Sequence, residues 1–137
     1  MPVLLDTGIL YAYYDRSDAW HERAVTVIRA EAGGLIVPAP VLPEVDHLLG
    51  HRLGAKAREV FYRSLVDGDY VVADLPHDRY ERVADLNRRF ADLELGFVDA
   101  AIVAIAEATG VPRLATADRR HFRPLAAALS LELLPSA

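Results

Sequence analysis

The sequence predicts an α/β fold: a three-layer sandwich in which helices cover both faces of a mostly parallel sheet of about five short strands. Short apolar runs alternate along the chain with longer segments in which apolar residues recur at helical spacing. Because parallel neighbouring strands need crossover helices, this alternation favours a parallel sheet. The chain has 137 residues, the size of one domain, and no linker, repeat or low-complexity segment divides it. We therefore expect a single domain over residues 1–137.

Five apolar runs are typical of short buried strands. They cover residues 3–5, 35–37, 70–73, 113–116 and 131–134. The first run ends at Asp6 and the fourth ends near Asp118, so each strand leads into an acidic residue. In open α/β sheets, ligands bind outside the carboxyl ends of the strands, which makes these two positions candidate ligand sites.

Helical periodicity predicts most of the segments between the strands. The expected helices cover residues 9–14, 19–32, 41–54, 55–66, 78–93 and 98–109. Asp18 is a suitable N-cap for the second of them. For the fifth we expect an inner face made of Tyr80, Val83, Ala84, Leu86 and Phe90. The sixth is apolar on all sides except at Asp99 and Glu107, so we expect it in the interior.

The composition excludes several classes of protein. Cysteine is absent, which excludes a disulfide scaffold, a thiolate zinc site and a cysteine nucleophile, and favours a reducing cytoplasm. No apolar stretch has the length of a membrane-spanning helix, and the N-terminus lacks the basic and apolar regions of a secretion signal. We therefore expect a cytoplasmic protein with no membrane partner.

The charge balance argues against binding of polyanions by bulk attraction alone. Lysine and arginine together number 15 and aspartate and glutamate 20, for a net charge of −5. If four of the acids were gathered in one metal site, the remaining side chains would be nearly balanced, at 16 acidic against 15 basic. All the basic residues except Lys56 are arginines, whose planar guanidinium suits phosphate, although codon bias is the simpler explanation.

Four acidic residues stand where a buried core is expected. Asp6 and Asp118 follow strands, Asp99 lies near the start of the interior helix, and Glu44 borders an apolar helical stripe. Taken singly, each has an ordinary explanation as a helix cap, a turn residue or a solvated helix residue. Together, at least the three aspartates would repel one another at one edge of the sheet and demand a cation. Carboxylate ligands without histidine or thiolate favour Mg²⁺ or Mn²⁺.

With these acids at its centre, the chain resembles PIN-domain ribonucleases, specifically the VapC-type toxins of bacterial and archaeal toxin–antitoxin pairs. The matching motifs are Leu4-Leu5-Asp6-Thr7, Pro43-Glu44, Val98-Asp99-Ala100-Ala101-Ile102-Val103-Ala104 and Thr116-Ala117-Asp118-Arg119-Arg120-His121-Phe122. They span nearly the whole chain, and their order and structural context are more specific than any one of them.

The resemblance implies a PIN-like α/β/α sandwich and a metal-dependent endoribonuclease. It implies that Asp6, Glu44, Asp99 and Asp118 form the acidic quartet of the active site. It also implies that the protein is a toxin, that it forms a homodimer, and that a small VapB-like antitoxin neutralises it.

Two positions depart from the pattern of the resembling proteins. Gly8 stands where many relatives carry serine or asparagine, so side-chain support for the first acid is expected from Thr7. Arg120 stands two residues after Asp118, where many relatives carry a further acid.

Phosphodiester hydrolysis needs a nucleophile, neutralisation of the phosphate and stabilisation of the leaving oxygen, which two divalent ions can supply without a histidine base. We expect Asp6 to be the central ligand, with Asp99 and Asp118 completing one metal site. Glu44 is expected to orient or activate the attacking water. Thr116 is a candidate support for Asp118 through its hydroxyl.

Basic and aromatic residues near these motifs are candidates for contact with RNA. Arg119, Arg120 and Arg123 follow Asp118 closely and are candidate contacts for phosphates. Aromatic rings stack on bases in many RNA-binding proteins, although burial in the core or at a subunit interface is their more usual role. The rings concerned are Tyr11, Tyr13, Tyr14 and Trp20.

Three other interpretations remain open at this stage. Asp6-Thr7-Gly8 matches the Asp-Thr-Gly of aspartic proteases, which predicts an all-β chain instead of this helical pattern. His47 and His51 lie four residues apart near Glu44, as in a zinc site, but Leu48 stands where a zinc hydrolase carries glutamate. The third is a catalytically silent PIN-fold module that binds RNA or protein.

Overall fold

All five expected strands are present in the computed structural model, which describes residues 1–136, and they form one sheet in the order β3-β2-β1-β4-β5. Every neighbouring pair is parallel, and Leu4 at the centre pairs with Ile36 on one side and Leu114 on the other. The strands are β1 (Val3–Leu5), β2 (Leu35–Pro38), β3 (Val71–Ala73), β4 (Arg113–Ala115) and β5 (Glu132–Leu134).

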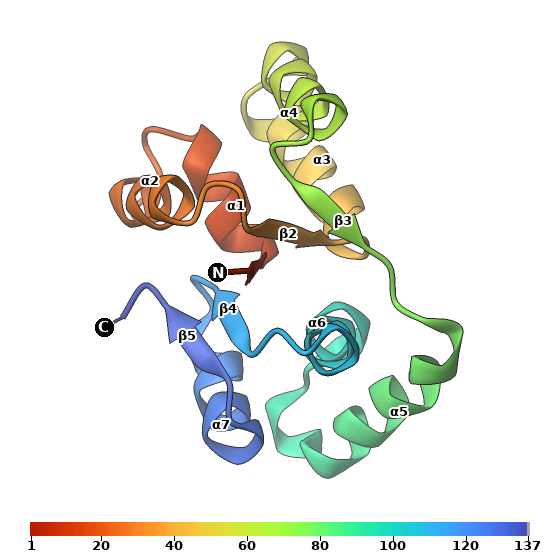
Figure 1. Ribbon diagram of the computed structural model, residues 1–137. Helices are drawn as coiled ribbons and strands as arrows, with labels where there is room; N and C mark the ends of the chain where they lie inside the picture. Colours follow the sequence, from red (N-terminus) through yellow and green to blue (C-terminus); the bar gives the residue numbers. More distant parts are fainter. Residues whose placement is uncertain (137) are drawn as a thin grey trace.

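The helices form a layer on each face of this sheet (Figure 1). Helices α1 to α4 lie on one face, and α5 to α7 lie on the other. Their bounds are α1 (Thr7–Tyr14), α2 (His21–Ala30), α3 (Val41–Arg52), α4 (Ala55–Asp67), α5 (Tyr80–Arg89), α6 (Gly96–Thr109) and α7 (Arg119–Leu129). This is the three-layer α/β/α sandwich that the sequence predicts, so the fold class is confirmed.

The order in which the chain adds strands to the sheet reverses at β1. From β1 it proceeds outward to β2 and β3, then passes back through α5 and α6 to place β4 on the opposite side of β1. β1 and β4 are therefore neighbours with their helices on opposite faces, which is the position where open α/β sheets bind ligands.

The core is densest around the central strand and one helix. The three residues of β1 are fully buried. In α6 a continuous run from Ala100 to Ala106 is buried, which confirms that this helix lies in the interior. Such a helix is apolar on all sides because α5 covers the face that the sheet does not.

One helix was not predicted from the sequence. α7 connects β4 to β5, and its buried residues are Phe122 and Leu125, three positions apart. The local sequence obscured it, because three arginines surround these apolar positions and Pro124 lies inside the helix. A stronger indication of a helix here is that β4 and β5 are parallel neighbours, because such a pair needs a crossover connection.

The fifth expected helix is shorter than predicted, and its inner face is smaller. A 3₁₀ turn, η1 (His77–Arg79), precedes α5, and a second one, η2 (Ala91–Leu93), follows it. Val83 and Leu86 are buried, but Tyr80 and Ala84 are exposed, so their assignment to the inner face was wrong. Tyr80 is the first residue of α5 and is 51% exposed.

Smaller differences concern helix starts. The Asp18 carboxylate accepts a hydrogen bond from the backbone N–H of Trp20, and α2 begins only at His21, so Asp18 closes the preceding turn and is not the N-cap. α6 begins at Gly96, two residues before its expected start. Among residues 1–136, no helix is both long and apolar enough to cross a lipid bilayer.

Candidate metal centre

Asp6 is the most deeply buried acid of the candidate site. It follows β1 and is the N-cap of α1, where one carboxylate oxygen accepts a hydrogen bond from the backbone N–H of Thr7 at 2.7 Å. The other oxygen accepts a hydrogen bond from the Thr116 hydroxyl, also at 2.7 Å. The residue is only 6% exposed. Both oxygens are thus fixed in position by donors from two neighbouring elements.

Thr116 connects the ends of β1 and β4. Its side chain is fully buried, and its hydroxyl accepts a hydrogen bond from the backbone N–H of Asp118 at 2.9 Å while it donates to Asp6. Asp118 in turn is the N-cap of α7, and its carboxylate accepts from the backbone N–H of His121 at 3.1 Å. Through this chain of hydrogen bonds, Thr116 fixes the backbone of Asp118 and the side chain of Asp6.

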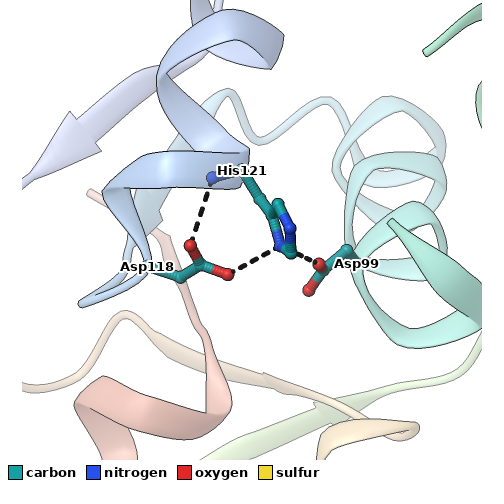
Figure 2. A group of neighbouring side chains, drawn as sticks. All are labelled: Asp99, Asp118 and His121. Carbon is teal, nitrogen blue, oxygen red and sulfur yellow. Dashed lines mark hydrogen bonds and ion pairs between the residues drawn. The ribbon is translucent and has the colours of Figure 1, made fainter. Parts of the chain in front are cut away.

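Asp99 approaches from the opposite side of the same edge, on the first turn of α6. Figure 2 shows the His121 ring between the carboxylates of Asp99 and Asp118. The Nδ1 atom of His121 lies 2.9 Å from Asp99 Oδ2 and 3.0 Å from Asp118 Oδ2. The imidazole therefore joins the two helices that carry these acids.

Glu44 completes the group from the first turn of α3. One of its carboxylate oxygens accepts a hydrogen bond from the Thr7 hydroxyl at 2.5 Å. The expectation that the Thr7 side chain supports Asp6 is therefore wrong, because the backbone of Thr7 supports Asp6 and its hydroxyl holds Glu44. Glu44 is exposed, in contrast to Asp6.

The four acids line one open hollow, which we call the acidic pocket. Its lining residues are Asp6, Thr7, Gly8, Glu44, Asp99, Ala117 and Asp118. They come from the N-terminal ends of four different helices, α1, α3, α6 and α7, or from the residues just before them. Folding thus brings together residues that are more than a hundred positions apart in the chain.

Burial and mutual repulsion make the acidic pocket unfavourable for negative charge. Burial raises the pKa of Asp6 to about 7, against the hydrogen bonds from Thr116 and Thr7 that lower it, and the charges of Asp99 and Asp118 add to the rise. Burial also raises the pKa of Asp99, and Asp118 raises it further, while His121 partly offsets both. A divalent cation would remove this cost by stabilising the ionised carboxylates.

The donor atoms in this region fit a divalent cation. Within the described part of the chain, one group of three metal-ligating side chains has ligand atoms within 4.8 Å of one another, and it consists of Asp99, Asp118 and His121. Carboxylate oxygens are the ligands that Mg²⁺ and Mn²⁺ prefer, and Asp6 supplies a further carboxylate in the same pocket. The chemistry of the residues present is therefore compatible with a metal centre.

The zinc and protease interpretations find no support in the geometry. His47 and His51 stack with ring centroids 5.6 Å apart on the outside of α3, while the carboxylate of Glu44 is bonded to Thr7 instead. The chain around Asp6 is an α/β sandwich and not the all-β fold that the Asp-Thr-Gly motif would require.

The three arginines that follow Asp118 have different environments. Arg119 donates to the carbonyl of Pro135 at 2.6 Å, and its guanidinium lies 5.5 Å from the ring centroid of Trp20. Arg120 and Arg123 are exposed on α7. Of the aromatic candidates, Tyr11 is buried, and the rings of Tyr13, Tyr14 and Trp20 pack partly against the core. Arg120 and Arg123 are therefore more accessible to a large ligand than Arg119.

His121 is the residue that the sequence analysis did not connect with the site. It belongs to one of the motifs that carry the resemblance, but the expected ligands were oxygens alone. The missing element was α7, because a histidine three residues after a helix N-cap lies above that cap on the same face of the helix.

Comparison with known proteins gives matches over most of the chain. Residues 3–127 match the PIN domain family. Ribonuclease VapC26 of Mycobacterium tuberculosis (strain ATCC 25618 / H37Rv) is 31% identical over 123 residues, which cover 90% of this chain and 91% of that protein.

Two solved structures show the same fold at lower sequence identity. M. tuberculosis VapC20, described as a sarcin-ricin loop cleaving toxin, has a TM-score of 0.74 at 23% identity, over 82% of this chain and 86% of that one. VapBC2 from Rickettsia felis, bound to a DNA fragment from their promoter, has a TM-score of 0.72 at 14% identity, over 97% of each chain.

We predict that Asp6 makes the metal-free protein less stable as the pH rises. Below its unfolded pKa of 3.8, Asp6 is protonated in both states, and between there and about 7 only the folded chain keeps the proton. The free energy of unfolding therefore falls through this range and stays low above it. Asp6→Asn removes this dependence and stabilises the EDTA-treated protein above pH 7 by up to about 4 kcal/mol. Urea denaturation at a series of pH values measures both effects.

Subtracting the unfolding free energy of Asp6→Asn from that of the wild type at each pH isolates the contribution of Asp6 from those of the other titrating groups. Identical pH profiles for the two proteins would contradict the burial of an unfavourable charge at Asp6.

Proposed function

Because the chain belongs to the PIN domain family and has a VapC ribonuclease among its relatives, we propose that it is a metal-dependent endoribonuclease. The reaction is hydrolysis of RNA phosphodiester bonds with Mg²⁺, or with Mn²⁺ in its place. The observation that carries this proposal is the convergence of Asp6, Glu44, Asp99 and Asp118 on one pocket at the switch between β1 and β4.

Asp6, Asp99 and Asp118 are the proposed metal ligands. Asp6 has the central place, because its carboxylate is the most buried and is held by Thr7 and Thr116. A divalent cation in this pocket would neutralise the scissile phosphate and lower the pKa of an attacking water. The two threonines keep Asp6 in place whether or not a substrate is present, so that little reorganisation is needed on binding.

Glu44 is the proposed general base or orienting group for the water. It is the exposed member of the pocket and therefore the acid that a substrate and its water meet first. Thr7 holds one carboxylate oxygen, and within residues 1–136 the other accepts no hydrogen bond from the protein. That second oxygen is available to accept a proton from water.

Arg120 and Arg123 are the proposed contacts for flanking RNA phosphates. They are exposed on α7, the helix that Asp118 caps, so an RNA strand that enters the acidic pocket passes close to them. Arg119 has a smaller role in this proposal, because its guanidinium is bound to Pro135 and packs near Trp20. Local positive charge from these arginines and the metal offsets a net charge of −5.

We further propose that the protein is the toxin of a toxin–antitoxin pair in the cytoplasm. In this role it forms a homodimer, and a small VapB-like antitoxin neutralises it. Structural relatives include a toxin–antitoxin complex from Klebsiella pneumoniae, with a TM-score of 0.66. Co-purification of the chain with the product of an adjacent reading frame tests this partner.

We predict that Asp6→Ala or Asp99→Ala abolishes RNA cleavage, a loss of at least about a hundredfold, while the protein stays folded. The test is a cleavage assay with purified protein on single-stranded RNAs and structured RNAs, among them the sarcin-ricin loop on which the similar VapC20 acts. EDTA stops the reaction, and Mg²⁺ or Mn²⁺ restores it. Glu59→Ala, an exposed acid on α4, is the matched control and keeps full activity.

The silent binding module is the second candidate function, and the same assay decides between the two. Metal-independent RNA binding with no cleavage of any RNA in the panel would favour the module. Full activity of Asp99→Ala would exclude the proposed active site even if the protein cleaves RNA.

We predict that Arg120→Ala and Arg123→Ala weaken RNA binding with little change in the turnover of bound RNA. Each substitution raises KM several-fold and reduces the slope of log affinity against log salt concentration by about one, because one phosphate contact is lost. Arg63→Ala, an exposed arginine on α4, is the control and leaves both quantities unchanged. Equal effects of all three substitutions would show that net charge alone matters.

A further inference from the structure

The backbone of α7 places the His121 side chain above Asp118. Asp118 is the N-cap of this helix, and its carboxylate accepts from the backbone N–H of His121, which fixes the two residues relative to each other. Residues three apart at a helix start share a face. The imidazole therefore points from α7 toward α6, where it meets Asp99 (Figure 2).

The two separations between His121 Nδ1 and the carboxylate oxygens match those between adjacent ligands around one cation. Nδ1 lies 2.9 Å from Asp99 Oδ2 and 3.0 Å from Asp118 Oδ2. Two ligands at right angles on an octahedral ion with bonds of about 2.1 Å are about 3.0 Å apart. The distance from Nδ1 to each carboxylate oxygen is thus the distance expected between two adjacent ligands of one ion.

The Nδ1 atom also lacks a well-aligned hydrogen-bond partner among the described residues. It is buried, and among residues 1–136 neither nearby carboxylate is aligned with it as a hydrogen-bond partner. A proton on Nδ1 can point at only one of the two carboxylates at a time. A cation between the three side chains would instead interact with all of them at once.

We propose that His121 Nδ1 is a metal ligand that acts together with Asp99 and Asp118. This inference rests on the proposed function, because it concerns the same metal centre. An imidazole is a softer ligand than a carboxylate. It suits transition metals, whereas Mg²⁺ prefers oxygen ligands. His121 therefore sets the cation preference of this chain toward Mn²⁺ over Mg²⁺. Arg120 stands where many of the resembling proteins carry a further acid and cannot ligate a cation, and His121 supplies the additional ligand.

The direct test is pulsed electron paramagnetic resonance of the Mn²⁺-loaded protein. We expect the wild-type spectrum to show coupling of Mn²⁺ to a histidine ¹⁴N nucleus, and this coupling to change when the histidines are labelled with ¹⁵N. His121→Asn replaces the nitrogen with an amide oxygen at a similar reach and removes the coupling. The control is His51→Asn, on the exposed side of α3, which retains it.

Metal affinity gives a second readout. Competition between Mn²⁺ and Mg²⁺, followed by the free Mn²⁺ signal, measures the ratio of the two affinities. We expect His121→Asn to lower Mn²⁺ affinity about tenfold or more and Mg²⁺ affinity much less, so that the preference for Mn²⁺ shrinks. Should His121→Asn fail to fold, the labelling experiment on wild type decides the question alone.

The inference is overturned if Mn²⁺ does not bind. It is also overturned if Mn²⁺ binds without histidine coupling, because the ring is then displaced by the cation and does not ligate it. An unchanged Mn²⁺ to Mg²⁺ ratio in His121→Asn also overturns it. RNA cleavage measured in parallel separates the two proposals. Cleavage without the coupling refutes only the role of His121, and the coupling without cleavage refutes only the proposed nuclease.

Discussion

The pairing of β1 with β4 is the constraint on which the candidate site depends. Asp6 and Asp118 follow these two strands, so the register that brings Leu5 beside Ala115 also brings the two acids to one edge of the sheet. Thr116 then ties one carboxylate to the backbone of the other. Because the strands are buried and central, the backbone positions of both acids at this edge are fixed by the core, and Asp6 is itself buried.

Helix N-termini make this concentration of negative charge tolerable. Asp6 and Asp118 cap α1 and α7, and Glu44 and Asp99 lie in the first turns of α3 and α6. Carboxylates near a helix N-terminus are stabilised by the helix dipole, typically by about 0.3–1 kcal/mol each. Burial nevertheless raises the pKa values of Asp6 and Asp99, so the helix termini offset only part of the cost of ionising these acids. A bound cation would remove the remaining cost of these buried charges.

Much of this arrangement could be predicted from the sequence, because two of the acids follow strands whose carboxyl ends meet at one edge of the sheet. Asp6 and Asp118 follow apolar runs that are recognisable as strands, and the interior helix is recognisable from its unbroken apolar surface around Asp99. The role of Thr7 could not be predicted, because its hydroxyl bonds to Glu44, 37 residues away. His121 was missed for a related reason: its approach to Asp99 depends on α7, whose periodicity is hidden by arginines and Pro124.

An anomalous-scattering crystal structure of the protein grown with Mn²⁺ tests the central claim most directly, since it locates the cation without reference to activity. The account predicts a Mn²⁺ peak in the acidic pocket, within bonding distance of carboxylate oxygens of Asp6, Asp99 and Asp118. A pocket with no peak at saturating Mn²⁺, or a peak beside His47 and His51 instead, would contradict it.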